Sequence, residues 1–301
     1  RGVRCEEGVV LGDECFVGEN AVVGAGVKVY PFKTVEAGAI INSSIVWESR
    51  GARSLFGRDG VSGLANVDIT PEFATRVAMA FATTVKKDST VIISRDSSRS
   101  ARMLKRAMMA GLNAGGVNVL DLEVASVPVT RLQARRPDAV AGITLRLAED
   151  DAQSVVIRFF DTNGSDISED AQRKVERLFN REDYRRVLPS EIGDIGFPPR
   201  ALDHYTAALG ETVDLSAVRS RGFKLVDVEA IDRAGFKVVV DYSYGSTSFV
   251  MANVFSKLGA EVLAVNPYVS TQGVVEFDHD AHAAQVATLV RASAAHLGAV
   301  I

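Results

Sequence analysis

Two short polar runs contain residue types that could bind a metal ion. Glu149, Asp150 and Asp151 are three consecutive carboxylates, and hard divalent cations prefer oxygen ligands. The run from Asp278 to His282, Asp-His-Asp-Ala-His, has a spacing that metal ligands can adopt. No further ligand in the sequence is tied to the first run, and the second falls on a loop before an expected helix. We therefore interpret both runs as solvated polar turns and predict no metal.

The other reactive side chains are isolated in the sequence. Cys5 and Cys15 are the only cysteines, without a CxxC pair or a nearby histidine to complete a zinc set. We expect them to be reduced thiols of a cytoplasmic protein. His204 and His296 are lone histidines on expected helices, where packing or exposure to solvent explains them.

Length, composition and charge exclude several classes of protein. The 301 residues are 47% hydrophobic and 24% charged, which is enough for two or three compact units. A formal net charge of -4 without long basic runs argues against nucleic acid as a partner. The apolar runs are far shorter than the roughly 20 residues of a membrane helix, so no membrane span is expected. Because the chain starts at Arg1 and ends like the start of a buried strand, we interpret it as a piece of a longer polypeptide.

The first fifty residues repeat with a period of six. One apolar series is Leu11, Val17, Val23, Val29, Val35, Ile41 and Trp47. A second series with the same period is Val9, Cys15, Ala21, Val27, Ala39 and Ile45, broken only by Lys33. Such a period is typical of a parallel β-helix, in which neighbouring coils complete each other's core. Residues 1–50 are therefore predicted to be the end-piece of a short left-handed parallel β-helix, with further coils upstream.

The remaining sequence alternates helices with apolar strands. A helix is expected to begin at Pro71 after the N-cap Thr70. The other expected helices span 98–112, 169–179, 248–258 and 281–296, and the strands span 90–94, 117–122, 139–145, 154–161, 236–242 and 261–266. This pattern predicts α/β domains with helices on both faces of a sheet. We expect one domain at 51–185, a linker at 186–198 and a second domain at 199–301.

Four segments resemble the α-D-phosphohexomutases, which include phosphoglucomutase, phosphomannomutase and phosphoglucosamine mutase. Residues 56–73 are similar to the opening F-G-T-D-G-I-R-G motif and its T-P-E helix, and residues 94–100 to the G-R-D-T-R-x-S strand end. Residues 142–164 align without gaps on the catalytic T-A-S-H-N-P stretch and the strand ending K-L-F-D-x-x-G. Residues 237–248 resemble the opening strand and turn of the second domain. The resemblance covers about residues 55–301 and implies a phosphohexomutase-like fold with a mixed sheet.

The catalytic stretch departs from the family pattern. On this alignment Ala148 falls on the phosphoserine, Arg146 on the threonine, Glu149 on the histidine and Asp150 on the asparagine. A mutase of this kind carries the phosphoryl group on an enzyme hydroxyl, and alanine has none. The adjacent carboxylates would also repel a sugar phosphate dianion. No catalytic residue is therefore assigned.

Some phosphate-binding character is still expected. Ser62 replaces the arginine that the family uses to hold phosphate, and Arg58 replaces a threonine. Residual binding of an anion or sugar phosphate is assigned to Arg58, Arg95, Arg99 and Arg146. Arg95 and Arg99 could equally form ion pairs with acids such as Asp96. The family's Asp-Gly-Asp metal loop would follow the strand that begins at Leu297, so no metal or cofactor is expected within this segment.

The combination of hexapeptide repeats and mutase-like domains resembles the C-terminal part of bacterial fusion proteins with a nucleotidyltransferase domain, such as mannose-1-phosphate guanylyltransferases. The resemblance implies an upstream partner domain that forms a sugar nucleotide with Mg²⁺, in carbohydrate metabolism. This segment would then be a noncatalytic pseudo-mutase, inactive as a mutase itself, that binds a sugar phosphate or nucleotide sugar and forms a homo-oligomer.

Two alternatives compete with the pseudo-mutase. The first is an active phosphomannomutase or phosphoglucomutase in which another hydroxyl, such as Ser154, carries the phosphoryl group. The second is a hexapeptide acyltransferase, which would need more coils and a catalytic histidine. Residues 1–47 contain no histidine, so the second alternative is nearly excluded.

Overall fold

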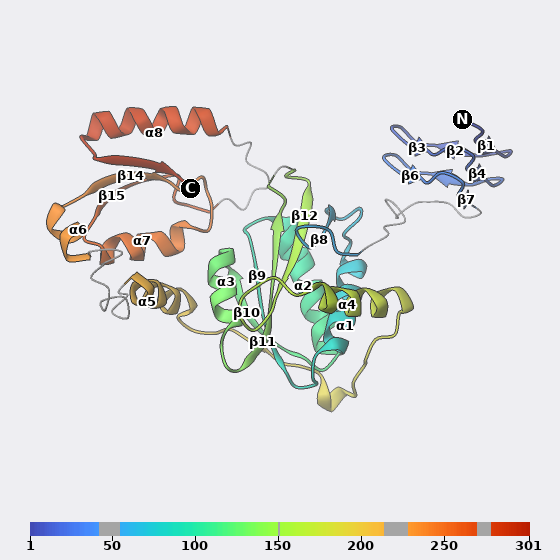
Figure 1. The fold of residues 1–301 in the computed structure, drawn as a ribbon, viewed down its shortest axis with the longest axis horizontal. Coiled ribbons are helices and arrows are strands. Elements are labelled where there is room, and N and C mark those ends of the chain that lie inside the picture. The colour runs from blue at the N-terminus through green and yellow to red at the C-terminus, as the bar shows by residue number, and fades with distance from the viewer. Residues whose placement is uncertain (42–54, 150, 214–227, 270–277) are drawn as a thin grey trace.

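The structure is a computed structural model that describes residues 1–41, 55–149, 151–213, 228–269 and 278–301 (Figure 1). The predictions for Ile45, Trp47 and Asp150 lie outside these residues. No helix in the described part of the chain is long and apolar enough to cross a membrane.

The N-terminal repeat unit, residues 1–41, consists of strands of two residues each. They are β1 (Arg4–Cys5), β2 (Val10–Leu11), β3 (Phe16–Val17), β4 (Val22–Val23), β5 (Lys28–Val29), β6 (Thr34–Val35) and β7 (Ile40–Ile41). The strands pair in parallel at an offset of 18 residues, three times the sequence period: β1 with β4, β4 with β7, β2 with β5 and β3 with β6. Val23, Val29 and Val35 are buried between them. Leu11, expected inside, is 45% exposed, since only β5 pairs with its strand.

The first α/β unit, residues 55–196, is built on a six-stranded mixed sheet. In spatial order the strands are β13 (Ile195–Gly196), β10 (Asn118–Val124), β9 (Thr90–Arg95), β11 (Ala139–Leu147), β12 (Ser154–Phe160) and β8 (Val61–Leu64). β9, β10, β11 and β13 run in parallel, whereas β12 is antiparallel to both of its neighbours. Ile92, Ile143 and Ile157 are fully buried in this sheet.

Helices cover both faces of the six-stranded sheet, as the sequence predicts. The helices are α1 (Pro71–Thr84), α2 (Arg99–Ala114), α3 (Val127–Ala134) and α4 (Glu169–Arg181). α1 packs against both α2 and α4 on one side of the strands, and α3 lies on the other side (Figure 1). Thr70 and Ser98 accept hydrogen bonds from Phe73 N and Ala101 N, which confirms two of the expected helix starts. The short helix α3 was not predicted.

The segment at 186–198, predicted to be a linker without regular structure, contains two ordered elements. Pro189–Glu191 forms a 3₁₀ turn, η1, and β13 pairs in parallel with β10 at the edge of the sheet. A Cβ atom at Gly193 would lie 2.0 Å from Val117 O, so only glycine permits this approach. Pairing with β10, rather than a local pattern, therefore orders this segment.

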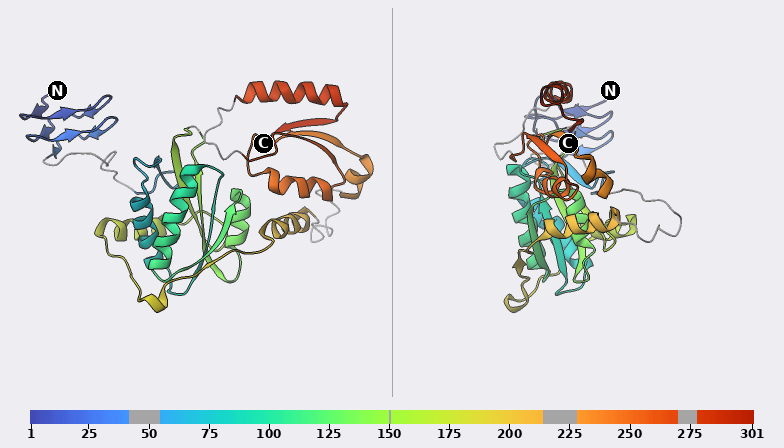
Figure 2. Two further views of the ribbon diagram at one scale, coloured as in Figure 1. Left: turned by 180° about the vertical axis from the view of Figure 1, so that it is seen from behind. Right: turned by 90° about the vertical axis from the view of Figure 1, so that its left-hand side faces the viewer.

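The second α/β unit, residues 228–301, has three parallel strands in the order β15 (Glu261–Val265), β14 (Lys237–Asp241) and β16 (Leu297–Val300). α6 (Val228–Ala234) precedes β14. Helices α7 (Ser248–Lys257) and α8 (His279–Ser293) lie on opposite faces (Figure 2). Helix α5 (Ala201–Val213) contacts both α3 and α7 and so connects the two units. Ala125, Val129 and Val250 form a small buried cluster there.

The last helix differs from its prediction at both ends. Asp278 is the N-cap and accepts hydrogen bonds from Asp280 N and Ala281 N, so the run 278–282 is a helix start and not a loop. The helix ends at Ser293 because Ala294 adopts a left-handed conformation with φ of 51°. His296 therefore lies beyond the helix, where its Nδ1 accepts a hydrogen bond from Lys237 N. His204 lies on α5, as predicted.

Candidate functional site

The segment that carries Ala148 is the turn of a β-hairpin. β11 and β12 pair from Gly142 opposite Phe160 to Leu147 opposite Val155. Beyond this ladder, Ala148 N donates a 2.9 Å hydrogen bond to Ser154 O. The half-buried Ala148 thus contributes a backbone contact, and its methyl group offers no group for covalent chemistry.

Asp151 closes this turn with its side chain. Its carboxylate accepts hydrogen bonds from Gln153 N and from the Ser154 hydroxyl. These two bonds lower the pKa of Asp151. Asp151 and Glu149 are both exposed, which agrees with the expected solvated turn.

Asp96 fixes the hairpin to the end of β9. Its Oδ2 accepts a 2.7 Å hydrogen bond from Leu147 N, and its Oδ1 accepts one of 2.9 Å from Ser98 N. The carboxylate thus joins the end of β11 to the start of α2. The ion pair suggested between Asp96 and Arg95 or Arg99 is not formed: Arg95 donates instead to Asp96 O and to Glu123.

Two of the four predicted anion-binding arginines lie on neighbouring strands. Arg95 pairs with Leu145 across the β9–β11 ladder, one position before Arg146. Arg95 is 8% exposed and donates to Asp96 O and to the Glu123 carboxylate, but its buried Nε has no hydrogen-bond partner among the described residues. Arg146 donates to Ala125 O at 3.2 Å. Burial lowers the pKa of the Arg146 guanidinium, opposed by the nearby Asp96 and Glu149 carboxylates.

The other two predicted arginines are more accessible. Arg99 is the first residue of α2 and is exposed, and the exposed Arg58 lies in the segment before β8. Ser62, at the family's arginine position, is exposed on β8 opposite Val156 of β12. Of the four predicted arginines, Arg95 is therefore buried and Arg146 half-buried, whereas Arg58 and Arg99 are exposed.

A buried ionic network behind Arg95 was not predicted from the sequence. Lys105 of α2 is 2% exposed, and its ammonium pairs with the carboxylate of Asp121 and with Glu123 Oε1 at 3.2 Å. Glu123 also binds Arg95, and its φ of 56° places it at a bulge near the end of β10. Burial alone would raise the pKa of Glu123, but its interactions with Lys105, Asp121 and Arg95 together outweigh burial and lower that pKa.

The second α/β unit has its own buried carboxylate at the end of β14. Asp241 is fully buried, and its Oδ2 lies 2.6 Å from Nδ1 of His282. Its Oδ1 accepts hydrogen bonds from Ser243 N and Asn266 Nδ2. Burial would raise the pKa of Asp241, but these hydrogen bonds outweigh it and lower that pKa. Nowhere in the described ranges do three His, Cys, Asp or Glu residues form a group that could hold a metal ion.

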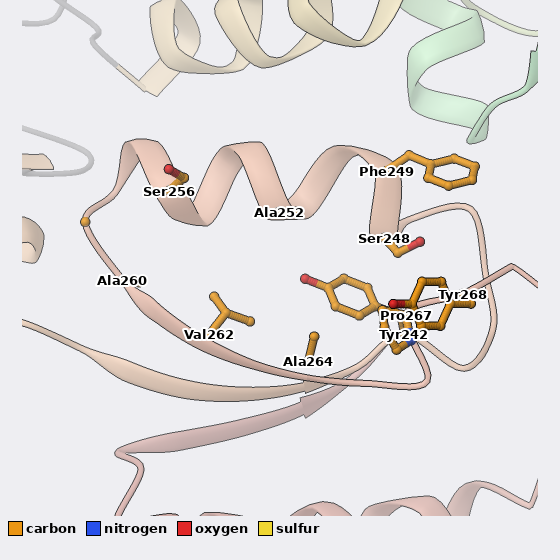
Figure 3. A pocket seen from close by; sticks show the side chains of 11 residues that line it. Tyr242, Ser248, Phe249, Ala252, Ser256, Ala260, Val262, Ala264, Pro267 and Tyr268 are labelled. Atoms are coloured by element: carbon orange, nitrogen blue, oxygen red, sulfur yellow. The ribbon is translucent and has the colours of Figure 1, made fainter.

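An open groove of about 610 Å³ lies between α7 and β15 (Figure 3). The ring of the buried Tyr242 points into it from the end of β14, and burial raises the pKa of Tyr242. Phe249, Val262 and Tyr268 are among the residues that line it, and none of its lining residues is charged. The groove therefore offers no positively charged side chain to a phosphate group, unlike the Arg95–Arg146 site.

The two α/β units have the fold of phosphohexomutases. A phosphoglucomutase/phosphomannomutase family protein from Burkholderia thailandensis superposes with a TM-score of 0.66 at 18% identity, covering 82% of this chain and 52% of that protein. A structure described as a putative phosphomannomutase from Thermus thermophilus gives 0.60 at 18% identity, covering 74% and 48%. At this identity the likeness defines the fold class.

Sequence comparison finds relatives of this chain among the phosphohexomutases. Residues 53–186 match "Phosphoglucomutase/phosphomannomutase, alpha/beta/alpha domain I". A phosphoglucomutase/phosphomannomutase of Thermococcus kodakarensis is 33% identical over 218 residues, which are 71% of this chain and 45% of the relative. A phosphoglucosamine mutase of Dictyoglomus thermophilum is also 33% identical over 218 residues, 71% and 44%. The chain spans about half the length of these curated relatives, and its residues 53–186 are similar to domain I of the phosphohexomutases.

Proposed function

We propose that this chain is a phosphohexomutase-like module that recognises a sugar phosphate or nucleotide sugar but carries no phosphoryl group on its hairpin. The observation that supports this most is Ala148 in the turn between β11 and β12. Asp96 and Asp151 accept backbone hydrogen bonds from Leu147 N and Gln153 N, on either side of position 148, yet Ala148, which aligns with the family's phosphoserine, has no hydroxyl. Arg95 and Arg146, on the adjacent strands, are the residues proposed to attract the anionic ligand.

The alternative is an active phosphomannomutase or phosphoglucomutase, and two observations favour it. The curated relatives are named as mutases. The Ser154 hydroxyl also donates a hydrogen bond to the Asp151 carboxylate, an arrangement in which the carboxylate could accept the hydroxyl proton. Ser154 begins β12 and lies opposite Leu64 of β8, six residues beyond Ala148.

One experiment separates the two proposals. The purified chain is incubated with glucose 1,6-bisphosphate or mannose 1,6-bisphosphate, and its intact mass is measured beside an active phosphohexomutase as a positive control. We expect no phosphoryl adduct on this chain. A stable adduct, mapped by fragmentation to Ser154 and lost in Ser154→Ala, together with sugar phosphate isomerisation, would establish the alternative.

We further propose that the N-terminal repeat unit is the end of a left-handed parallel β-helix that follows a sugar-1-phosphate nucleotidyltransferase domain, of the mannose-1-phosphate guanylyltransferase type. The 18-residue pairing offset supports a β-helix, because three six-residue repeats, each with one short strand, complete one coil. Mg²⁺ would belong to that upstream domain, since the described residues contain no fitting ligand group. The assembly is proposed to be a cytoplasmic homo-oligomer.

The nucleotidyltransferase proposal is tested on the complete polypeptide. The coding sequence upstream of Arg1 should encode a Gly-rich loop with a nearby arginine and lysine after the first strand. Pyrophosphate release from mannose 1-phosphate and GTP is then measured with the expressed full-length protein. An upstream sequence without such a loop, or a full-length protein without this activity, contradicts the proposal.

A further inference from the structure

Lys33 occupies a position where the six-residue repeat otherwise places an apolar or small residue. In its series the other described members are Val9, Cys15, Ala21, Val27 and Ala39. The side chain of Lys33 is nevertheless buried, with 3% exposed. Phe16 N donates to Lys33 O at 2.9 Å, so the preceding Cys15 stacks on Lys33 within the ladder of β3 and β6. A buried lysine at this position requires a partner, because a buried charge is unfavourable unless it is paired.

The partner of Lys33 lies outside the repeat unit. Its Nζ is 3.6 Å from Oδ1 of Asp68, in the turn between β8 and α1. Asp68 Oδ1 is buried and accepts no hydrogen bond from the described residues, whereas Oδ2 accepts a hydrogen bond from Leu64 N. Each charge thus offsets the desolvation of the other. β6 lies on the side of the repeat unit that faces the first α/β unit (Figure 1).

The turn that contains Asp68 is rigidly built. Asp68 N donates to Leu64 O at 2.9 Å, and Asn66 adopts a left-handed conformation with φ of 61°. β8 pairs with β12, and Ala65 N donates to Gln153 O in the hairpin turn next to Asp151. The carboxylate that meets Lys33 is therefore on an element continuous with the hairpin that carries Ala148.

We propose that Lys33 is a docking residue, which holds the N-terminal repeat unit on the β8–α1 turn by pairing with Asp68, so that the two parts keep one fixed orientation. The interaction surface is the end of the repeat unit at Lys33, and its partner is an acidic turn of the same chain. The lysine that interrupts the apolar series is thus explained by the contact between the two parts. This inference does not depend on the proposed function, because it concerns the arrangement of the chain and no reaction.

The test uses the full 301-residue chain with Lys33→Met, Asp68→Asn and the double variant. Methionine is also unbranched, one atom shorter than lysine, and suits an apolar position, so the repeat unit should remain folded. We expect the Leu64 and Asp68 amides to exchange their hydrogens about fivefold faster or more in each single variant. X-ray scattering should show a larger radius of gyration. Arg4→Met, at an exposed basic residue of β1, is the matched control and should change neither measurement.

The exchange of the Val10 and Val22 amides reports on the repeat unit itself, because these groups donate to Val27 O and Ala39 O within it. In Lys33→Met, protected Val10 and Val22 amides show that the repeat unit is folded. The inference is overturned if, in that case, the radius of gyration and the exchange rate of the Asp68 amide equal those of the wild type. It is also overturned if the effects of the two single variants simply add in the double variant. If Lys33→Met unfolds the repeat unit, Asp68→Asn decides alone, since that change lies in the other partner.

Discussion

The carboxyl ends of β9 and β14 each have an aspartate that closes the following turn, but the surroundings of the two aspartates differ. Asp96 and Asp241 both accept a backbone hydrogen bond from the residue two positions later, Ser98 and Ser243. Asp96 lies near the buried Arg95 and the half-buried Arg146. The next strand, β10, contributes the carboxylates that pair with Arg95 and Lys105. Asp241 is satisfied by an amide and an imidazole, beside an uncharged groove.

This difference supports the proposal that the end of β9, and not the end of β14, binds an anionic ligand. At β14 the carboxylate accepts hydrogen bonds from Ser243 N and the Asn266 amide and lies against the His282 ring, and no lysine or arginine takes part in the interactions described for Asp241. At β9 the buried Nε of Arg95 still has no hydrogen-bond partner among the described residues. A similar local turn can therefore serve packing in one unit and ligand recognition in the other.

The largest expected effect comes from breaking the charge network of the first unit. In Lys105→Met the Asp121 carboxylate remains buried without its ammonium partner, and we expect a loss of about 3–5 kcal/mol in the free energy of unfolding. Urea denaturation followed by circular dichroism measures this loss. The control is Lys87→Met, which removes an exposed ion pair with Glu191 and should leave the free energy of unfolding nearly unchanged. Equal effects of the two variants would contradict the role of burial.

The next effect compares the two aspartates directly. Asp241→Ala leaves Ser243 N, the Asn266 amide and His282 without their acceptor in a fully buried position, so we expect a loss of about 2–3 kcal/mol in unfolding free energy. Asp96→Ala, at a half-buried position, should cost about 1–2 kcal/mol. Urea denaturation of both variants in parallel provides the comparison. A larger loss in Asp96→Ala would reverse our ranking of the two sites.

A smaller effect follows from the lowered pKa of Asp241. An acid whose pKa is lower in the folded protein stabilises the fold fully above its unfolded pKa of about 3.9, and this contribution is lost as the pH falls through the folded value. The wild type should therefore lose stability below about pH 4 more steeply than Asp241→Asn. Melting temperatures between about pH 2 and pH 6 measure this slope. Parallel profiles for the two proteins would show that Asp241 does not contribute.

The smallest expected effect concerns ligand binding at the charged end. Arg146→Gln removes one of the two guanidinium groups of the proposed site, and we expect the affinity for mannose 1-phosphate to fall about three- to tenfold. Isothermal titration calorimetry measures this change. Arg181→Gln, at an exposed arginine of α4, is the control and should bind like the wild type. Unchanged binding in Arg146→Gln would remove Arg146 from the proposed site.

The sequence predicts the elements whose start or core is encoded locally. Thr70 with Pro71 marks the start of α1, and apolar runs mark β9, β11 and β12. Helix α3 has a comparable signal, Ser126 followed by a proline at position 128, but its eight residues are too few for a clear apolar periodicity. β13 has no local pattern at all, because its order comes from pairing with β10.

The candidate site was less predictable than the fold. Lys105 lies on a helix between Leu104 and Met108, and helical spacing cannot show that its ammonium meets two carboxylates from β10. Likewise, the proximity of Asp96 to arginines suggested an ion pair, whereas its oxygens take the N–H groups of Ser98 and Leu147. Both arrangements bring together segments that are far apart in the sequence. A local sequence pattern cannot show which of these segments are close in space.

The closure of the hairpin by Ala148 has a consequence for the history of such loops. Its hydrogen bond to Ser154 uses only the backbone N–H, which every residue except proline possesses. The reactive side chain can therefore be gained or lost here by single substitutions without passing through an unfolded protein. The stability of the hairpin therefore sets no requirement for a reactive side chain at position 148.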